Sequence, residues 1–184
     1  MYSSALQQIF NEFQDLQQNP IPTIGLVVGM PDQNNPFLWQ CTMVGPSDTS
    51  FSGGLFYLRI IFPSDYPQKA PEVLFLTPIY HVNVNHIKQP NCPLGHICIS
   101  TLNFWNPSYR MREVLTNIFA LFYMGNPDSP YGIDRQGEMV NNRSLFEEKI
   151  RYFTKKYANP QMPCKQYDYW DFSYPNNKLM QQNH

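Results

Sequence analysis

Residues 54–78 have the sequence GLFYLRIIFPSDYPQKAPEVLFLTP, in which two apolar runs are each ended by proline. Runs of this length, rich in Leu, Phe, Ile and Val and bounded by Pro, Asp and Gly, are typical of β-strands. Two similar runs precede them, GLVVGMP at residues 25–31 and LWQCTMVGP at residues 38–46. Because no helical pattern interrupts these four runs, we expect them to pair as an antiparallel meander.

Helical patterns flank the expected sheet on both sides. Apolar residues recur at helical spacing from Leu6 to Leu16, which predicts a first helix. Ser4 and Gln7 have the spacing of an N-terminal capping box, and Pro20 marks the end of this helix.

Further helices are predicted in the C-terminal half. The stretch REVLTNIFALFYMG, residues 112–125, is apolar on nearly every side, which predicts a central helix buried on most faces and capped by Gly125. Ser144 and Glu147 form another capping box ahead of an apolar periodic stretch that Pro160 ends. The expected fold class is α+β: an N-terminal helix, a four-stranded antiparallel sheet, a central helix and C-terminal helices.

The composition indicates one globular domain. A chain of 184 residues with 42% hydrophobic residues is long enough for one core. We expect residues 1–160 to form the core domain. Residues 161–184, which are aromatic and amide-rich without clear periodicity, are expected to form an extension that is partly ordered at most.

The charge and the apolar pattern exclude several classes of partner. A net charge of -1 gives no general attraction to nucleic acid or acidic membranes, so neither is expected as a partner. We find no apolar run of about 18 residues and no signal-peptide pattern at the start. The expected location is therefore the cytoplasm, the nucleus or both.

The cysteines are expected to be free thiols. An intracellular chain with Cys41, Cys92, Cys98 and Cys164 favours thiol chemistry or metal binding over disulfides. Two of them lie in YHVNVNHIKQPNCPLGHICIS, residues 80–100, together with three histidines.

Zinc binding is one interpretation of this stretch, because His86, Cys92, His96 and Cys98 are ligand types that zinc prefers. Their order matches no familiar zinc spacing, and coordination would block the Cys98 thiol, so we expect no metal site. In an extended chain His96 and Cys98 share a face and form a possible Cys-His pair. The sequence offers no clear third member of a hydrolase triad.

Several motifs in order resemble the ubiquitin-conjugating enzyme family. They are FPSDYPQKAPEVLFLTPIYHVN, GHICISTLNFWNP, GNPDSP and TKKYANP, and the match covers about residues 4–159. The family fold is an N-terminal helix, a four-stranded antiparallel sheet and a helical C-terminal half, which agrees with the elements predicted above.

The resemblance implies that Cys98, in GHICIS, carries ubiquitin or a ubiquitin-like modifier as a thioester. The modifier is then passed to a lysine amine or to a ligase cysteine. Cysteine suits this chemistry because a thiolate is a good nucleophile and its thioester stays reactive toward a second thiol or an amine. The alternative for Cys98 is a small buried apolar residue.

His81 and Asn83 fall on the His-Pro-Asn signature of the family, with Val82 in place of proline. Asn83 is a candidate donor to the carbonyl oxygen that becomes negative when an amine attacks the thioester. A structural role in tying down the loop is weighed equally. We interpret His81 as structural, and the loss of proline frees the backbone at Val82.

The motif GNPDSP corresponds to a rim of the active site. Family members often carry a carboxylate immediately before the second proline, where this chain has Ser129, with Asp128 one position earlier. Ser129 has no charge at pH 7 unless it is phosphorylated. Simple turn formation is the alternative for both residues.

The spacing between Asn83 and Cys98 exceeds the family's usual one, which indicates an insertion within residues 84–96. This insertion is interpreted as a lip over the thioester or as a plain solvated loop.

The resemblance also assigns partner surfaces. The activating enzyme is expected to dock on the first helix, where Gln7, Gln8 and Asn11 replace basic residues and the first basic residue of the chain is Arg59, so the attraction is weak. ATP is consumed by that upstream enzyme, and no cofactor is expected here.

The expected ligase surface consists of the same face of the first helix together with loop positions Gln68, Pro107 and Ser108. Pro107 after Trp105 suits a RING-type ligase, whereas Gln68 lacks the aromatic bulk that favours HECT-type ligases. Trp105 itself is expected to pack in the core. The expected contacts with the donor modifier are Thr116, Asn117 and Ala120 on the outer face of the central helix.

Two other functions are weighed. The first is a non-catalytic binding or scaffold variant of the same fold. Cys98 and Asn83 argue against it, while Val82, the insertion and the non-basic first helix favour it. The second is a metal-binding or hydrolytic cysteine protein without modifier transfer.

Overall fold

The computed structural model describes residues 4–22, 25–32, 34–161 and 170–175. Its elements are α1 (Ser4–Gln18), β1 (Val27–Gly29), β2 (Leu38–Val44), β3 (Leu55–Ile61), β4 (Glu72–Phe75), α2 (Ser100–Asn103), α3 (Met111–Ala120), α4 (Ile133–Asn141) and α5 (Arg143–Tyr157). The predicted α+β class is confirmed.

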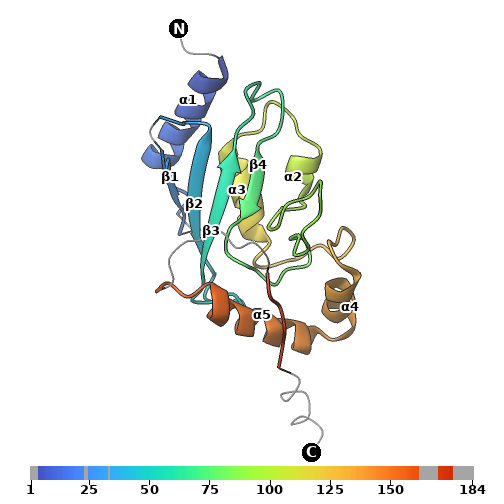
Figure 1. Ribbon diagram of the computed structural model, residues 1–184. Coiled ribbons are helices and arrows are strands. Elements are labelled where there is room, and N and C mark those ends of the chain that lie inside the picture. The colour runs from blue at the N-terminus through green and yellow to red at the C-terminus, as the bar shows by residue number, and fades with distance from the viewer. Residues whose placement is uncertain (1–3, 23–24, 33, 162–169, 176–184) are drawn as a thin grey trace, which may run out of the picture.

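The four strands form one antiparallel sheet in the order β1-β2-β3-β4, which confirms the predicted meander. Cys41 of β2 lies opposite Leu58 of β3, which in turn lies opposite Phe75 of β4. Alternate side chains of β2 and β3 point into the core, as the period of two along a strand requires: Trp39, Cys41, Met43, Phe56, Leu58 and Ile60. Figure 1 shows α3 behind this sheet, with α1 at one end and α5 at the other.

The carboxylate of Glu12 joins α1 to α3 inside the protein. Its Oε1 accepts a hydrogen bond from the Tyr66 hydroxyl at 2.7 Å, and its Oε2 accepts one from the Met111 backbone N–H at 2.6 Å. Met111 is the first residue of α3, where backbone N–H groups lack partners within the helix and a negative charge is favourable. Glu12 therefore fixes the start of α3 against α1.

The central helix α3 is shorter and more one-sided than predicted. It ends at Ala120 rather than at Gly125, because the N–H of Leu121 bonds to the carbonyl of Ile118 in a tighter turn. Thr116 and Ala120 are exposed, so the prediction that this helix is buried on most faces is wrong.

The start of α5 also differs from the prediction. Asn142 caps the helix, with its Oδ1 accepting a hydrogen bond from the Leu145 N–H at 3.2 Å. Ser144 is already helical, and Glu147 pairs with Arg143 rather than completing a capping box. In α1, likewise, the side chain of Gln7 donates forward to Asn11.

The predicted extension is represented by residues 170–175, which cross α5 in Figure 1. Trp170 is buried, and Asp171 accepts a hydrogen bond from Lys156 of α5 at 3.1 Å. Residues 162–169 and 176–184 lie outside the described residues.

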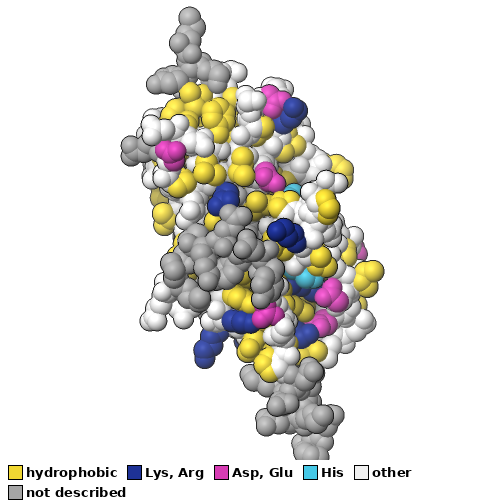
Figure 2. Space-filling view, in the orientation of Figure 1, with side chains coloured by type: hydrophobic (Ala, Val, Ile, Leu, Met, Phe, Trp, Pro, Cys, Tyr) yellow, Lys and Arg dark blue, Asp and Glu magenta, His cyan; other side chains and the backbone are white. Residues whose placement is uncertain are grey.

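Charged side chains of both signs are interspersed on the face shown in Figure 2. Within the described part of the chain, no helix combines the length and apolar character needed to cross a bilayer.

Replacing Glu12 by alanine should destabilise the fold, because the Met111 N–H and the Tyr66 hydroxyl lose a charged acceptor in a buried place. We expect a loss of about 2–3 kcal/mol in the free energy of unfolding, measured by urea denaturation. The matched control Asp15→Ala, on the exposed side of the same helix, should cost less than about 1 kcal/mol. Equal losses for the two variants would contradict this account.

Candidate active site

The thiol of Cys98 is partly exposed and is held by three segments of the chain. Its backbone N–H bonds to the carbonyl of Asn83 at 2.9 Å, which places the two residues side by side. Its Sγ lies 3.1 Å from Oγ of Ser129 and accepts a hydrogen bond from Nδ2 of Asn103 at 3.2 Å. Two polar side chains therefore contact the sulfur, that of Asn103 from α2 and that of Ser129 from the turn after α3.

Cys98 opens into a groove of about 480 Å³ between α2, α3 and the turn after α3. The groove also contains Asn117 of α3, whose Nδ2 donates to Oγ1 of Thr101 at 2.5 Å. Cys41 provides a contrast, because it is fully buried and burial raises the pKa of its thiol to about 12. Cys98 is thus placed as an accessible thiol rather than as a buried apolar residue.

The side-chain amide of Asn83 is fully buried and clamps the turn beside the thiol. Its Nδ2 donates to the carbonyls of Asn126 at 2.8 Å and Ser129 at 2.9 Å, and its Oδ1 accepts from the Asn126 N–H at 2.6 Å. Both amide hydrogens are therefore in use. The expected loop-tying contacts are present, and donation to a substrate oxygen requires one of them to be released.

The imidazole of His81 contacts only backbone groups among the hydrogen bonds described. Its Nδ1 accepts from the Asn83 N–H at 3.0 Å, so its proton lies on Nε2, which is 3.0 Å from the Leu121 carbonyl. Burial lowers the pKa of His81 to about 4, so the ring is neutral at pH 7. These are the contacts that a structural role requires.

Ser129 and Asp128 differ in their relation to the thiol. Ser129 directs its hydroxyl at Cys98, whereas Asp128 is exposed and its N–H bonds to Oδ1 of Asn126 within the turn. Ser129 thus contacts the thiol, whereas Asp128 takes part in the hydrogen bonding of the turn.

The insertion before Cys98 is anchored at both ends. Asn85 is fully buried, and its Nδ2 donates to the carbonyls of Cys92 at 3.0 Å and Pro93 at 2.9 Å. Gly95 has φ +80°, and a Cβ there would lie 2.0 Å from the Phe75 carbonyl oxygen. The insertion therefore packs against β4, while its tip, residues 87–91, and Pro93 are exposed.

The insertion is exposed to solvent at its tip and anchored at its base by Asn85. None of residues 84–96 lines the groove at Cys98.

His96 is directed at Tyr131, with its Nδ1 in hydrogen-bond contact with the tyrosine hydroxyl. The same hydroxyl lies 3.9 Å from Sγ of Cys92. Burial lowers the pKa of His96, and no contact between His96 and Cys98 accompanies this arrangement. In the described part of the chain, no group of three or more His, Cys, Asp or Glu residues is placed to hold a metal ion.

Comparison with known proteins agrees with this geometry. Residues 8–154 match the family model described as ubiquitin-conjugating enzyme. The chain belongs to the ubiquitin-conjugating enzyme family. It is 37% identical over 157 residues to ubiquitin-conjugating enzyme E2 N of Drosophila melanogaster, covering 85% of this chain and 97% of that protein. It is also 37% identical over 153 residues to ubiquitin-conjugating enzyme E2 13 of Schizosaccharomyces pombe, covering 83% and 97%.

On this ubiquitin-conjugating enzyme, the positions expected to dock an activating enzyme lie on α1. Gln7 and Asn11 are exposed and bond to each other at 3.0 Å, while Gln8 donates to the buried Glu12 at 2.7 Å. The sequence prediction found no basic residue near this helix.

The structure adds two arginines to that surface. Arg110 and Arg112, at the start of α3, line a hollow together with residues of α1. Nε of Arg112 donates to the Asp15 carboxylate at 2.9 Å. Sequence reasoning missed these arginines because they lie about a hundred positions from the helix that they adjoin.

The three positions of the expected ligase surface come together in space. Trp105 is partly buried, and its Nε1 donates to the Pro67 carbonyl at 2.7 Å, which joins the two loops. Gln68, Pro107 and Ser108 are exposed on these loops. Trp105 packs against the core with its ring partly buried, as expected.

The three positions proposed to contact a donor modifier share the exposed side of α3. Thr116, Asn117 and Ala120 are all exposed, and Asn117 also lines the groove at Cys98. This surface is continuous with the thiol.

Asn83→Asp should be strongly destabilising although it is isosteric. The new oxygen replaces both donors and faces the carbonyl oxygens of Asn126 and Ser129 in a buried place. We expect a loss of about 2–4 kcal/mol in the free energy of unfolding by urea denaturation. The control Asn91→Asp, at the exposed tip of the insertion, should change it by less than about 0.5 kcal/mol. A stable Asn83→Asp protein would show that the clamp is unimportant.

Acid should weaken the fold through two histidines. Burial lowers the pKa of His81 and of His86 to about 4, and the Arg135 charge contributes at His86. Since the unfolded pKa is about 6.5, the unfolded state binds more protons below that pH, so stability is complete above it and is lost as pH falls toward 4. At pH 5 we expect a loss of roughly 1–2 kcal/mol for each histidine.

Nitrogen NMR of the imidazoles checks this directly. Both rings should remain neutral in the folded protein at pH 5. A midpoint near pH 6.5 for His81 would be inconsistent with its burial.

Proposed function

We propose that Cys98 carries ubiquitin or a ubiquitin-like modifier as a thioester and passes it to a lysine amine or to a ligase cysteine. The observation that supports this most is the accessible Sγ of Cys98, which faces Ser129 and Asn103 at the end of a groove. Family membership supplies the reaction type.

The reaction consists of two acyl transfers at one sulfur. The Cys98 thiolate attacks the thioester carbonyl held by the activating enzyme, and the cysteine of that enzyme leaves. A lysine amine or a ligase thiol then attacks the new thioester, loses its proton, and expels the Cys98 thiolate. Hydrogen bonds from Ser129 and Asn103 stabilise negative charge on the departing sulfur.

Asn83 is proposed to aid the second transfer. Its position beside Cys98 suits donation to the developing oxyanion once the turn releases one amide hydrogen. Asp128 and His81 are proposed to hold the surrounding turns rather than to act on substrate.

The partners follow from the surfaces already described. The activating enzyme, which consumes ATP, is proposed to dock on α1 with Arg110 and Arg112 supplying positive charge, and this chain uses no cofactor of its own. Gln68, Pro107 and Ser108 favour a RING-type over a HECT-type ligase. The donor modifier is proposed to contact Thr116, Asn117 and Ala120. The protein is proposed to act in the cytoplasm or nucleus, without nucleic acid or membrane as a partner.

A loading assay tests this proposal. The full chain is incubated with ATP, activating enzymes and their modifiers, and is resolved on non-reducing gels beside Cys98→Ala and Cys92→Ala. We expect an adduct that thiols remove, that is lost in Cys98→Ala, and that persists in Cys92→Ala.

Absence of an adduct with every activating enzyme would contradict the proposal. In that case the protein would be a non-catalytic binding variant of the fold, and its direct binding to ubiquitin would be measured. Hydrolysis of small esters, or bound zinc, would indicate the metal or hydrolytic alternative.

A further inference from the structure

A charged side chain of α4 is buried next to the segment that leads to the active site. Arg135 is only 1% exposed. Removing a guanidinium from water is costly unless the protein compensates it. Burial lowers its pKa to about 10, so it stays charged at neutral pH. The cost of burying this charge indicates that the guanidinium holds other groups in place.

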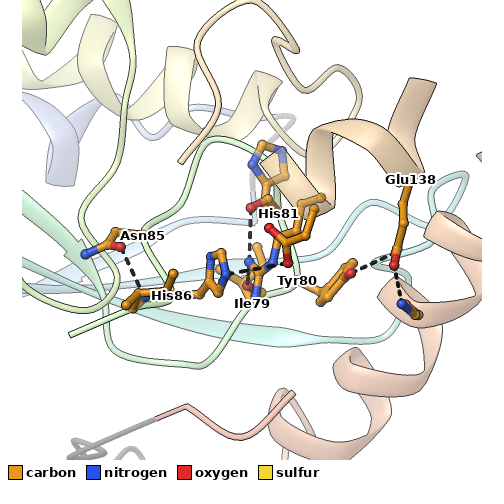
Figure 3. Close-up of polar contacts among 10 residues, drawn as sticks. Ile79, Tyr80, His81, Asn85, His86 and Glu138 are labelled. Carbon is orange, nitrogen blue, oxygen red and sulfur yellow. Dashed lines mark hydrogen bonds and ion pairs between the residues drawn. The ribbon is translucent and has the colours of Figure 1, made fainter. Parts of the chain in front are cut away.

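The guanidinium holds the backbone just before Asn83. Nη1 of Arg135 donates to the carbonyls of His81 at 3.1 Å and Ile79 at 3.4 Å. Figure 3 shows this segment, with Tyr80 joined to Glu138. His81 in turn accepts the N–H of Asn83 on its ring. The Arg135 side chain thus fixes the backbone that leads into Asn83, and with it the position of the Asn83 amide.

The orientation of the guanidinium depends on two aromatic rings. Its central carbon lies 4.4 Å from the ring centre of Tyr80 and 4.4 Å from that of Phe172, so it is stacked between them. Tyr80 is itself fixed by its hydroxyl, which donates to Glu138 at 2.8 Å. Within the described residues, Nε and Nη2 of Arg135 have no hydrogen-bond partner, so these rings are its main lateral support.

One of the two rings belongs to the C-terminal segment 170–175. Phe172 packs edge-on against Phe153 of α5, with ring centres 4.9 Å apart. Tyr174 donates from its hydroxyl to Glu148 at 2.5 Å, which adds a second attachment to α5. The segment that completes the Arg135 site therefore lies outside the matched family region, residues 8–154.

We infer that Arg135 is a positioning residue for transfer from Cys98 to lysine, and that docking of Phe172 completes its site. The inference rests on the proposed thioester at Cys98. Without Arg135 the His81 carbonyl loses its donor, the approach to Asn83 loosens, and the amide clamp on the turn that carries Ser129 weakens. Transfer, which needs this turn in place beside Cys98, is affected more than loading.

The test uses the full chain in single-turnover discharge of the preformed thioester to free lysine, at several lysine concentrations. Arg135→Met should lower the limiting rate constant about tenfold while the half-saturating lysine concentration and the loading rate change less than about threefold. Arg135→Lys, which keeps the charge, should restore part of the rate. Phe172→Ala should lower it about threefold or more, in the same direction.

The matched control is Lys155→Met, which removes an exposed cation of α5 in place of the buried Arg135. Its limiting rate constant should equal that of the unaltered protein. If Arg135→Met fails to fold, Phe172→Ala carries the test, since it leaves the arginine in place. A limiting rate constant within twofold of the unaltered protein in a folded variant overturns the inference, as does an equal loss of loading and discharge.

A second measurement needs no activity. Hydrogen exchange of the Asn83 side-chain amide is followed by NMR in the protein without a bound modifier. It should be faster in Arg135→Met and Phe172→Ala but not in Lys155→Met. Unchanged exchange overturns the inference. If the unaltered protein never loads a modifier, the proposed function fails, and this measurement still decides whether Arg135 holds the loop.

Discussion

The active site depends on one buried amide, that of Asn83. Its three hydrogen bonds to Asn126 and Ser129 join the segment after β4 to the turn after α3, two segments that no regular secondary structure connects. Its backbone carbonyl also accepts the N–H of Cys98. Because a buried amide with unsatisfied groups is costly, both segments are held in a single arrangement around the thiol.

The surroundings of this clamp are polar but largely uncharged. Burial keeps His81 neutral, and Ser129 and Asn103 face the sulfur with a hydroxyl and an amide. Such groups orient a thiol and support a leaving thiolate without competing for protons near neutral pH. The one buried cation nearby, among the described side chains, is Arg135, and it acts on the backbone rather than on the sulfur.

Local patterns in the sequence were sufficient for the sheet but not for the surroundings of the site. The strands were predicted because alternating burial is a property of consecutive residues, and motif order located Cys98 and Asn83. The end of α3 and the cap at Asn142 depend on which of several possible hydrogen bonds forms, and residue spacing in the sequence does not show which one is preferred. Arg135 stacked under Phe172, like Arg112 beside Asp15, is a contact between distant parts of the chain and has no local signal.

The most direct test of the central claim is to map the modifier by mass spectrometry after loading and digestion under non-reducing, mildly acidic conditions. The account predicts that the modifier's C-terminal carboxyl is joined to the sulfur of Cys98. Attachment at Cys41, Cys92 or Cys164, or to a lysine without any cysteine adduct, would contradict it.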